Sequence, residues 1–237
     1  MQETNRPNEF LPRPRALVSW SGGKDSCLAA HLVVERGFDL ATLVCMAEPD
    51  ADRSRSHALP EWVLRAQAAA LGCELRMPRA GWPDYEAVFV RTLDELRAAG
   101  CTHAVFGDID LEPHREWEEK VCAMATLRAE LPLWLWPRER VVEEVFGRGI
   151  EAICACVNTR YLPAEFCGRP YDADFIRDLP PSVDACGENG EFHTCVTRAP
   201  LFSARVDVRV SGRQRYVAPP ELGSAEFWFA KLEPTAV

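Results

Sequence analysis

Six consecutive residues, Ser21-Gly22-Gly23-Lys24-Asp25-Ser26, combine two glycines, a cation and two hydroxyls between two apolar runs. The runs, residues 16–18 and 27–34, predict a strand before this stretch and a helix after it. Glycines let the backbone approach an anion, the helix N-terminus directs N–H groups and a positive dipole end at it, and Lys24 adds a full charge. The stretch therefore predicts a phosphate site, where Ser21 and Ser26 can donate hydroxyls.

The commonest phosphate loop, GxxxxGK[ST], does not fit this stretch. Its first glycine would be Val18 and its metal-binding hydroxyl residue would be Asp25. All six residues instead match the SGGKDS loop of the PP-loop ATP pyrophosphatases, which the stretch resembles. That resemblance implies ATP cleavage between the α and β phosphates, adenylation of a carboxylate or carbonyl oxygen, and displacement of AMP by a nitrogen or sulfur nucleophile. The alternative is a glycine turn with an exposed lysine.

A second polar stretch, residues 184–194, holds three acids, an amide, a thiol and a histidine within eleven residues. Gly187 and Gly190 bracket Glu188 and Asn189, which suits backbone packed close to a ligand. The alternative is a solvated hairpin tip. We predict that this loop faces the SGGKDS loop across a shared cleft, because an adenylate formed at one must be attacked by a nucleophile held at the other.

Together the two loops resemble the diphthine–ammonia ligase family of the PP-loop superfamily, in the GENGEFHT form of its bacterial branch (residues 187–194). The likeness extends from Ala16 to about Phe202. It includes His57 after the second strand, Arg115 in the helix after a Gly-Asp strand end, and Pro132-Leu133-Trp134.

The resemblance implies roles for individual residues. The residues expected to bind ATP are Ser21, Gly22, Gly23, Lys24, Asp25, Ser26, Met46, His57, Asp108 and Arg115. The residues expected to bind the acyl substrate are Cys186, Gly187, Glu188, Asn189, Gly190, Glu191, His193 and Thr194. Lys24, Asp25, Glu188 and Glu191 are expected to be catalytic, and Asp25 and Asp108 to hold Mg²⁺. From the sequence alone, a capping role for Asp108 is about as well supported.

Composition limits the class of protein. The 237 residues are 47% hydrophobic and 27% charged, which is typical of a globular protein, and the formal charge of −9 argues against nonspecific nucleic-acid binding. Most of the ten cysteines lie in apolar runs and no CxxC pair occurs, which argues against a zinc ribbon or a CxxC sulfur relay. The first fifteen residues lack an apolar segment, so we expect a flexible tail over residues 1–14, no membrane partner and a cytoplasmic protein.

Alternating strand and helix patterns predict an α/β fold, a doubly wound parallel sheet of the PP-loop (adenine nucleotide alpha hydrolase-like) kind. The last parallel strand is expected at residues 132–137, after a helix over residues 112–130. Beyond residue 180 the pattern predicts antiparallel strands, with a turn at residues 211–213 between two of them. We expect a PP-loop ATP-binding domain over residues 15–136 and a smaller C-terminal α+β substrate-binding lobe over residues 137–237.

The predicted function is an ATP-dependent ligase that adenylates a carboxylate and transfers ammonia to it. The expected partners are ATP, ammonium and an unidentified carboxylate. A homodimer of this chain is also considered. Two alternatives are a PP-loop enzyme of the tRNA-thiolation type and an ATP-binding module without turnover.

Overall fold

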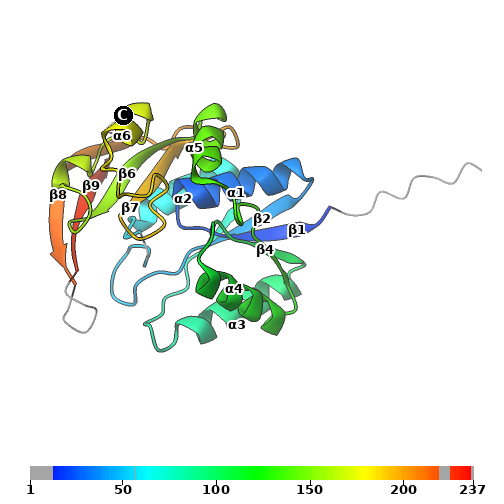
Figure 1. Cartoon of the computed structure of the whole chain (residues 1–237). Coiled ribbons are helices and arrows are strands. Elements are labelled where there is room, and N and C mark those ends of the chain that lie inside the picture. The colour runs from blue at the N-terminus through cyan, green and yellow to red at the C-terminus, as the bar shows by residue number, and fades with distance from the viewer. Residues whose placement is uncertain (1–12, 56, 219–224, 236–237) are drawn as a thin grey trace, which may run out of the picture.

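The computed structural model describes residues 13–55, 57–218 and 225–235 (Figure 1). The predicted tail, residues 1–14, lies outside the described residues except for its last two. The elements in chain order are β1 (Arg15–Ser19), α1 (Lys24–Glu35), β2 (Asp39–Val44), α2 (Glu61–Leu71), β3 (Glu74–Arg76), α3 (Tyr85–Ala98), β4 (His103–Val105), α4 (Glu112–Met124), β5 (Arg128–Glu130), α5 (Arg138–Gly147), β6 (Glu151–Asn158), the 3-10 turn η1 (Ala164–Phe166), α6 (Ala173–Asp178), β7 (Phe192–Arg198), β8 (Val208–Val217) and β9 (Glu226–Pro234).

The first five strands form a parallel sheet in the order β3-β2-β1-β4-β5, so the predicted α/β fold is confirmed. Side chains alternate across it, as the period of a strand requires: Ala16 and Val18 belong to the core under α1 and α2, and Leu17 to the core under α3 and α4. Figure 1 shows α1 and α5 on one side of this sheet and α3 and α4 on the other. Connections leave β1 and β4 toward opposite faces, which opens a crevice at their carboxyl ends.

The remaining strands form an antiparallel sheet in the order β7-β6-β9-β8. The antiparallel prediction is confirmed, but the turn predicted at residues 211–213 is wrong. β8 continues through these residues, and its register against β9 shifts between Val210 and Gly212. A bulge of this kind absorbs one extra residue without ending the strand.

The strand predicted at residues 132–137 is also wrong, and the helix predicted over residues 112–130 is too long. α4 ends at Met124 and the fifth parallel strand is β5, before the Pro-Leu-Trp stretch. Residues 131–136 form consecutive turns, in which Trp134 N–H donates to the Leu131 carbonyl and Trp136 N–H to the Leu133 carbonyl. These local bonds use the backbone groups that a sheet ladder would need.

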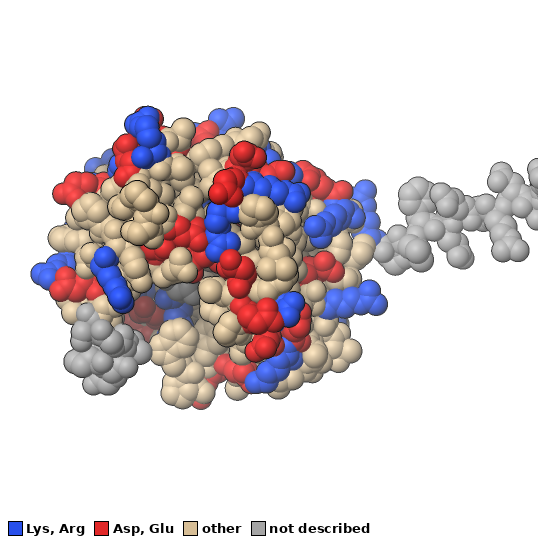
Figure 2. Space-filling model, viewed as in Figure 1, with Lys and Arg blue, Asp and Glu red and all other residues tan. Residues whose placement is uncertain are grey.

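The two sheets share one hydrophobic core. The cluster under α1 and α2 continues through Val141 and Val145 of α5 into Ala152, Cys154 and Val157 of β6. On the face drawn in Figure 2, basic and acidic side chains are interspersed, as expected for a protein of this composition. The predicted domain boundary between residues 136 and 137 stays a prediction.

Candidate functional site

The SGGKDS loop links β1 to α1 and is held from behind by a buried glutamine. Gln67 of α2 donates from Nε2 to the Gly22 carbonyl (3.0 Å) and the Val196 carbonyl (2.8 Å), and its Oε1 accepts from the Trp20 indole (2.8 Å). Gly22 has φ 82°, and a Cβ there would lie 2.6 Å from Leu59 Cδ1. Because glycine has no Cβ, it adopts this positive φ without strain and avoids the clash with Leu59.

The SGGKDS loop and the first turn of α1 are packed between strand β7 and the loop after β4. Lys24 N–H donates to Thr194 Oγ1 at 3.0 Å, and Val196 N–H donates to the Gly22 carbonyl at 2.9 Å. On the other side, a Cβ at Gly107 would lie 2.8 Å from Ser26 N, so the loop after β4 also lies directly against this turn. The Ser21 and Ser26 hydroxyls, 3.1 Å apart, line the cavity in front of it.

Lys24 is not exposed, in contrast to the simple glycine-turn alternative. Its side chain is 2% exposed, and Nζ donates to Asp25 Oδ1 (3.0 Å), Asp25 Oδ2 (2.8 Å) and the Cys186 carbonyl. Burial alone would lower the pKa of Lys24, but the Asp25 carboxylate outweighs this effect and the pKa is raised. Lys24 is therefore a permanent cation that ties the SGGKDS loop to the second loop.

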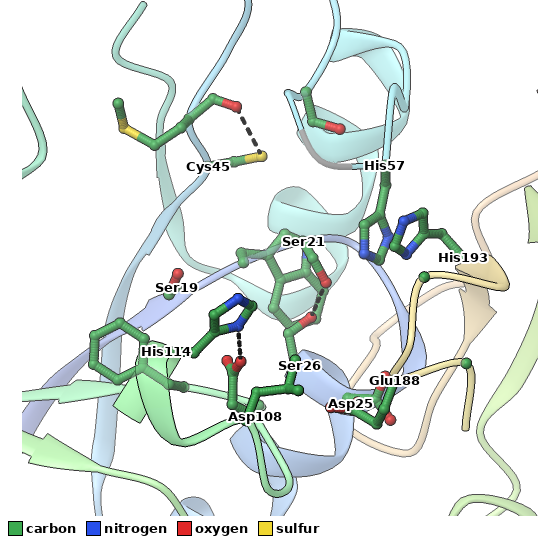
Figure 3. A pocket seen from close by; sticks show the side chains of 18 of the residues that line it. Ser19, Ser21, Asp25, Ser26, Cys45, His57, Asp108, His114, Glu188 and His193 are labelled. Carbon is green, nitrogen blue, oxygen red and sulfur yellow. Dashed lines mark hydrogen bonds and ion pairs between the residues drawn. The ribbon is translucent and has the colours of Figure 1, made fainter. Parts of the chain in front are cut away.

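The second loop faces the first, as predicted, and is not a solvated tip. Cys186, Gly187, Glu188, Asn189, Gly190, His193 and Thr194 line the same cavity as Ser21, Lys24, Asp25 and Ser26. Figure 3 shows Glu188 beside Asp25. Burial first, and then the nearby Asp25 charge, raise the pKa of Glu188 to about 7. Cys186 is 3% exposed and burial raises the pKa of its thiol to about 12, so this sulfur is not a thiolate near neutral pH.

Glu191 does not line the cavity, in contrast to its predicted catalytic role. It is 1% exposed, and its carboxylate accepts hydrogen bonds from Asp184 N, Asn189 N and Asn189 Nδ2 at 2.9–3.1 Å. These bonds occupy both oxygens. Glu191 therefore stabilises the conformation of the loop that places Glu188 at the cavity.

Two histidines close one side of the cavity. The rings of His57 and His193 stack with centroids 4.3 Å apart (Figure 3), and His57 Nδ1 lies 3.2 Å from the Thr194 carbonyl. Burial lowers the pKa of both rings, that of His193 to about 4. Both are therefore neutral near pH 7, and His57 lies against the SGGKDS loop, since a Cβ at Gly23 would be 2.7 Å from its Cε1.

The opposite side of the cavity comes from the end of β4 and from α4. Asp108 accepts a hydrogen bond from His114 Nδ1 at 2.7 Å, and burial first, then the nearby Asp108 charge, raise the pKa of Glu118 to about 11. Arg115, predicted to bind ATP, does not line the cavity: its guanidinium pairs with Glu112 and Glu119 and lies over the Trp134 ring. The helix turns the side chains of His114 and Glu118, four residues apart, toward Asp108 and turns Arg115 away.

The cavity has a volume of about 980 Å³, large enough for a nucleotide together with a second ligand. The lining residues that were not predicted from the sequence include Ser19, Ser54, Trp82, Tyr85, Glu86, His114, Trp117 and Glu118. Met46, His57 and Asp108 line it as predicted, whereas Gly22 and Gly23 support it from behind.

Comparison with known proteins decides the family. The model of the diphthamide synthase N-terminal domain matches residues 14–129, and that of the diphthamide synthase C-terminal domain matches residues 137–220. The chain belongs to the diphthamide synthase family. It is accordingly a PP-loop ATP pyrophosphatase-type enzyme, as the SGGKDS resemblance indicated.

A solved structure from Methanocaldococcus jannaschii, described as a predicted subunit of tRNA methyltransferase, is similar to this diphthamide synthase family member. It is 16% identical, with 78% of this chain and 97% of that chain covered and a TM-score of 0.42, values at which it bears on no functional question. No curated protein sequence matches the chain. Within the described residues, no helix is both long and apolar enough to cross a membrane.

The acids of the cavity fit a magnesium ion brought in with ATP. No group of three or more potential metal ligands occurs in the described part of the chain, so a preformed all-protein cage is absent there. Mg²⁺ in nucleotide sites uses one or two carboxylates together with substrate phosphates. Asp25 and Asp108 both line the cavity and are close enough for the Asp108 charge to raise the pKa of Asp25, which is already raised by burial. A shared cation would relieve this repulsion.

Proposed function

We propose that this protein is an ATP-dependent carbon–nitrogen ligase. It adenylates a carboxylate with release of pyrophosphate, and ammonia then displaces AMP to leave an amide. The observation that carries this proposal is the convergence of the SGGKDS loop and the Glu188 loop on one cavity. A reaction with two successive displacements at one carbonyl carbon needs phosphate-binding and nucleophile-activating groups side by side.

The first half-reaction would be driven by electrostatic stabilisation. The Ser21 and Ser26 hydroxyls, the Lys24 charge and the N–H groups of the first α1 turn other than that of Lys24 would stabilise the departing pyrophosphate. Asp25 and Asp108 would hold Mg²⁺, which would neutralise phosphate charge when bound. Because Lys24 donates to Asp25 and the Cys186 carbonyl, its part in this step is to fix the two loops and supply a constant positive field.

The second half-reaction would require a base. Ammonium must lose a proton before it can attack, and a carboxylate with a pKa of about 7 can accept that proton near neutral pH and release it afterwards. Glu188 is the carboxylate of the second loop that faces the cavity. It is half-buried, so ammonia held there would be screened from bulk water that competes for the adenylate.

The geometry favours nitrogen over sulfur transfer. Sulfur carriers need an accessible thiolate, whereas the pKa of every one of the ten cysteines is raised, chiefly by burial. A protein that binds ATP without turnover does not require a carboxyl group such as Glu188, with a pKa of about 7, beside the phosphate loop.

Isotope exchange between pyrophosphate and ATP tests the proposal, because exchange reports adenylation before the nitrogen acceptor is known. A screen of carboxylate pools should identify substrates that support exchange. Glu188→Gln should retain exchange and lose amide formation with ammonium, whereas the matched control Glu143→Gln, on the exposed side of α5, should retain both. Absence of exchange with every pool, or full amide formation by Glu188→Gln, would refute the mechanism.

A further inference from the structure

Arg138, the first residue of α5, does not line the cavity but joins two of the loops that do. Its Nε donates to Asp184 Oδ2 at 2.6 Å, and its Nη2 donates to Asp110 Oδ1 at 2.9 Å. Asp184 begins the second loop, whereas Asp110 belongs to the loop after β4, two residues beyond Asp108. The side chain of Asp184 is 10% exposed and that of Arg138 is 24% exposed, so their ion pair is partly shielded from solvent. One guanidinium therefore ties together two walls of the cavity.

Asp184 transmits this restraint to the rest of the second loop. Its Oδ1 accepts a hydrogen bond from Cys186 N at 2.7 Å, and its own N–H donates to Glu191 Oε1 at 3.1 Å. The Cys186 carbonyl in turn accepts a hydrogen bond from Lys24 Nζ. The place at which the second loop enters the cavity therefore depends on a carboxylate that Arg138 binds.

The backbone before α5 is strained where it brings Arg138 toward Asp110. Leu135 has a φ of 59°, a value that side chains other than glycine and asparagine rarely adopt. Its N–H donates to the Ile109 carbonyl at 2.7 Å, directly before Asp110 in the chain. The Leu135 side chain is 70% exposed, so its own packing does not offset the strain. Strained backbone of this kind persists where the surrounding structure fixes it, and it clusters at functional sites.

Arginine suits this double contact better than lysine. Its guanidinium is planar and presents N–H donors in fixed directions, so Nε and Nη2 bind two carboxylates at the same time. The ammonium of a lysine is a point charge on a flexible stem, and it would bind one carboxylate without fixing the direction of the other.

We propose that Arg138 is a positioning residue, which holds the second loop against the loop after β4 so that Glu188 stays in place for the second half-reaction. This inference rests on the proposed ligase function, since the second half-reaction is the attack of ammonia on the adenylate. Arg138 acts through Asp184 and Asp110 and needs no contact with a substrate. Its loss should therefore slow amide formation more than adenylation.

Arg138→Met and Arg138→Lys test this proposal at a temperature well below the Tm of every variant, with a carboxylate found by the pyrophosphate-exchange screen. Arg138→Met should lower kcat for amide formation about 10- to 100-fold, because a displacement of about 1 Å far from the reacting atoms can cause such a loss. Pyrophosphate exchange and its KM for ATP should stay close to the wild-type values, since Lys24 keeps its ion pair with Asp25. Arg138→Lys should recover only part of the lost kcat, and it carries the same comparison if Arg138→Met does not fold.

The matched control is Arg148→Met. Arg148 follows α5 directly, its side chain is 20% exposed, and it also pairs with two carboxylates, those of Glu35 and Glu144, neither of which lines the cavity. This variant loses a comparable pair of contacts and should retain kcat. Deuterium exchange at the backbone N–H of Cys186 should accelerate in Arg138→Met and stay unchanged in Arg148→Met.

Four results would overturn the proposal: a wild-type kcat in Arg138→Met, an equal loss of kcat in Arg148→Met, a parallel loss of exchange and amide formation, or unchanged deuterium exchange at Cys186. A wild type that shows no pyrophosphate exchange with any carboxylate would instead overturn the ligase proposal. Faster deuterium exchange at Cys186 in Arg138→Met alone would in that case still support the positioning of the second loop by Arg138.

Discussion

Replacing Lys24 by methionine should destabilise the protein as well as impair its chemistry. The substitution keeps the apolar stem of the side chain but removes the charge that Asp25 and the Cys186 carbonyl bind. Removing one partner of a buried ion pair costs about 3–5 kcal/mol, because the other charge is left uncompensated. The Asp25 side chain is 22% exposed, so we expect the lower end, about 3 kcal/mol.

For a chain of this length that loss corresponds to a fall in Tm of about 6–12 °C. Lys24→Met should remain folded, because domains have about 5–15 kcal/mol of stability. The double variant Lys24→Met with Asp25→Asn should recover most of the loss, since neither partner is then charged. Lys231→Met, an exposed lysine of β9, is the matched control and should leave Tm unchanged.

Calorimetry and urea denaturation measure these quantities directly. A Tm of Lys24→Met equal to that of the wild type would contradict the buried ion pair. A double variant no more stable than Lys24→Met would show that the Asp25 charge is not the source of the loss.

Three further predictions follow from the loops and histidines of the site. Glu191→Gln should lower amide formation and leave pyrophosphate exchange unchanged, because an amide oxygen and an NH₂ group cannot accept all three N–H bonds that shape the Glu188 loop. The backbone N–H of Asn189 should then exchange with deuterium faster, and an unchanged deuterium-exchange rate would contradict this prediction. Gly22→Ala should lower the free energy of unfolding by at least about 1–2 kcal/mol, because the backbone at this position has a φ of 82°, and by more because the new Cβ would clash with Leu59. A Tm at or above the wild-type value would refute the packing argument. The contribution of His193 to stability should be lost as pH decreases from about 6.5 to about 4, because unfolded His193 takes up a proton that the folded ring, with its pKa lowered to about 4, does not. The contribution is on the order of 3 kcal/mol, so the difference in unfolding free energy between the wild type and His193→Gln should change by about this amount over that pH range, and a constant difference would contradict the buried neutral ring.

Both loops of the site could be predicted because each is contiguous in sequence. The types and spacing of Ser21–Ser26 and of residues 184–194 identify a phosphate loop and a polar glycine loop without knowledge of the fold. Their apposition could be predicted only from the chemistry of two steps at one carbon. The burial of Lys24 could not be predicted from the sequence, because the residues that enclose it, Cys186 and Thr194, lie about 160 residues later in the chain.

Residues contributed singly by helices were missed. His114 and Glu118 carry no local signal, since α4 contains seven charged or histidine side chains and only its orientation decides which of them face Asp108. Arg115 was predicted to bind ATP for the same reason, because the orientation of α4 cannot be read from the sequence. The strand expected at residues 132–137 failed for a different reason: its apolar content suits burial, and Leu133 is indeed fully buried, but in a turn rather than a ladder.

The bonds of Gln67 to the Gly22 and Val196 carbonyls have a consequence for the order of folding. Strand β7 is among the last elements synthesised, yet it fixes the backbone of a loop made near the beginning. Contacts so distant in sequence form late, because closure of the intervening chain must come first. During synthesis the parallel sheet can therefore assemble before the SGGKDS loop has its final shape, and we expect high nucleotide affinity only after β7 has been synthesised and has bound this loop.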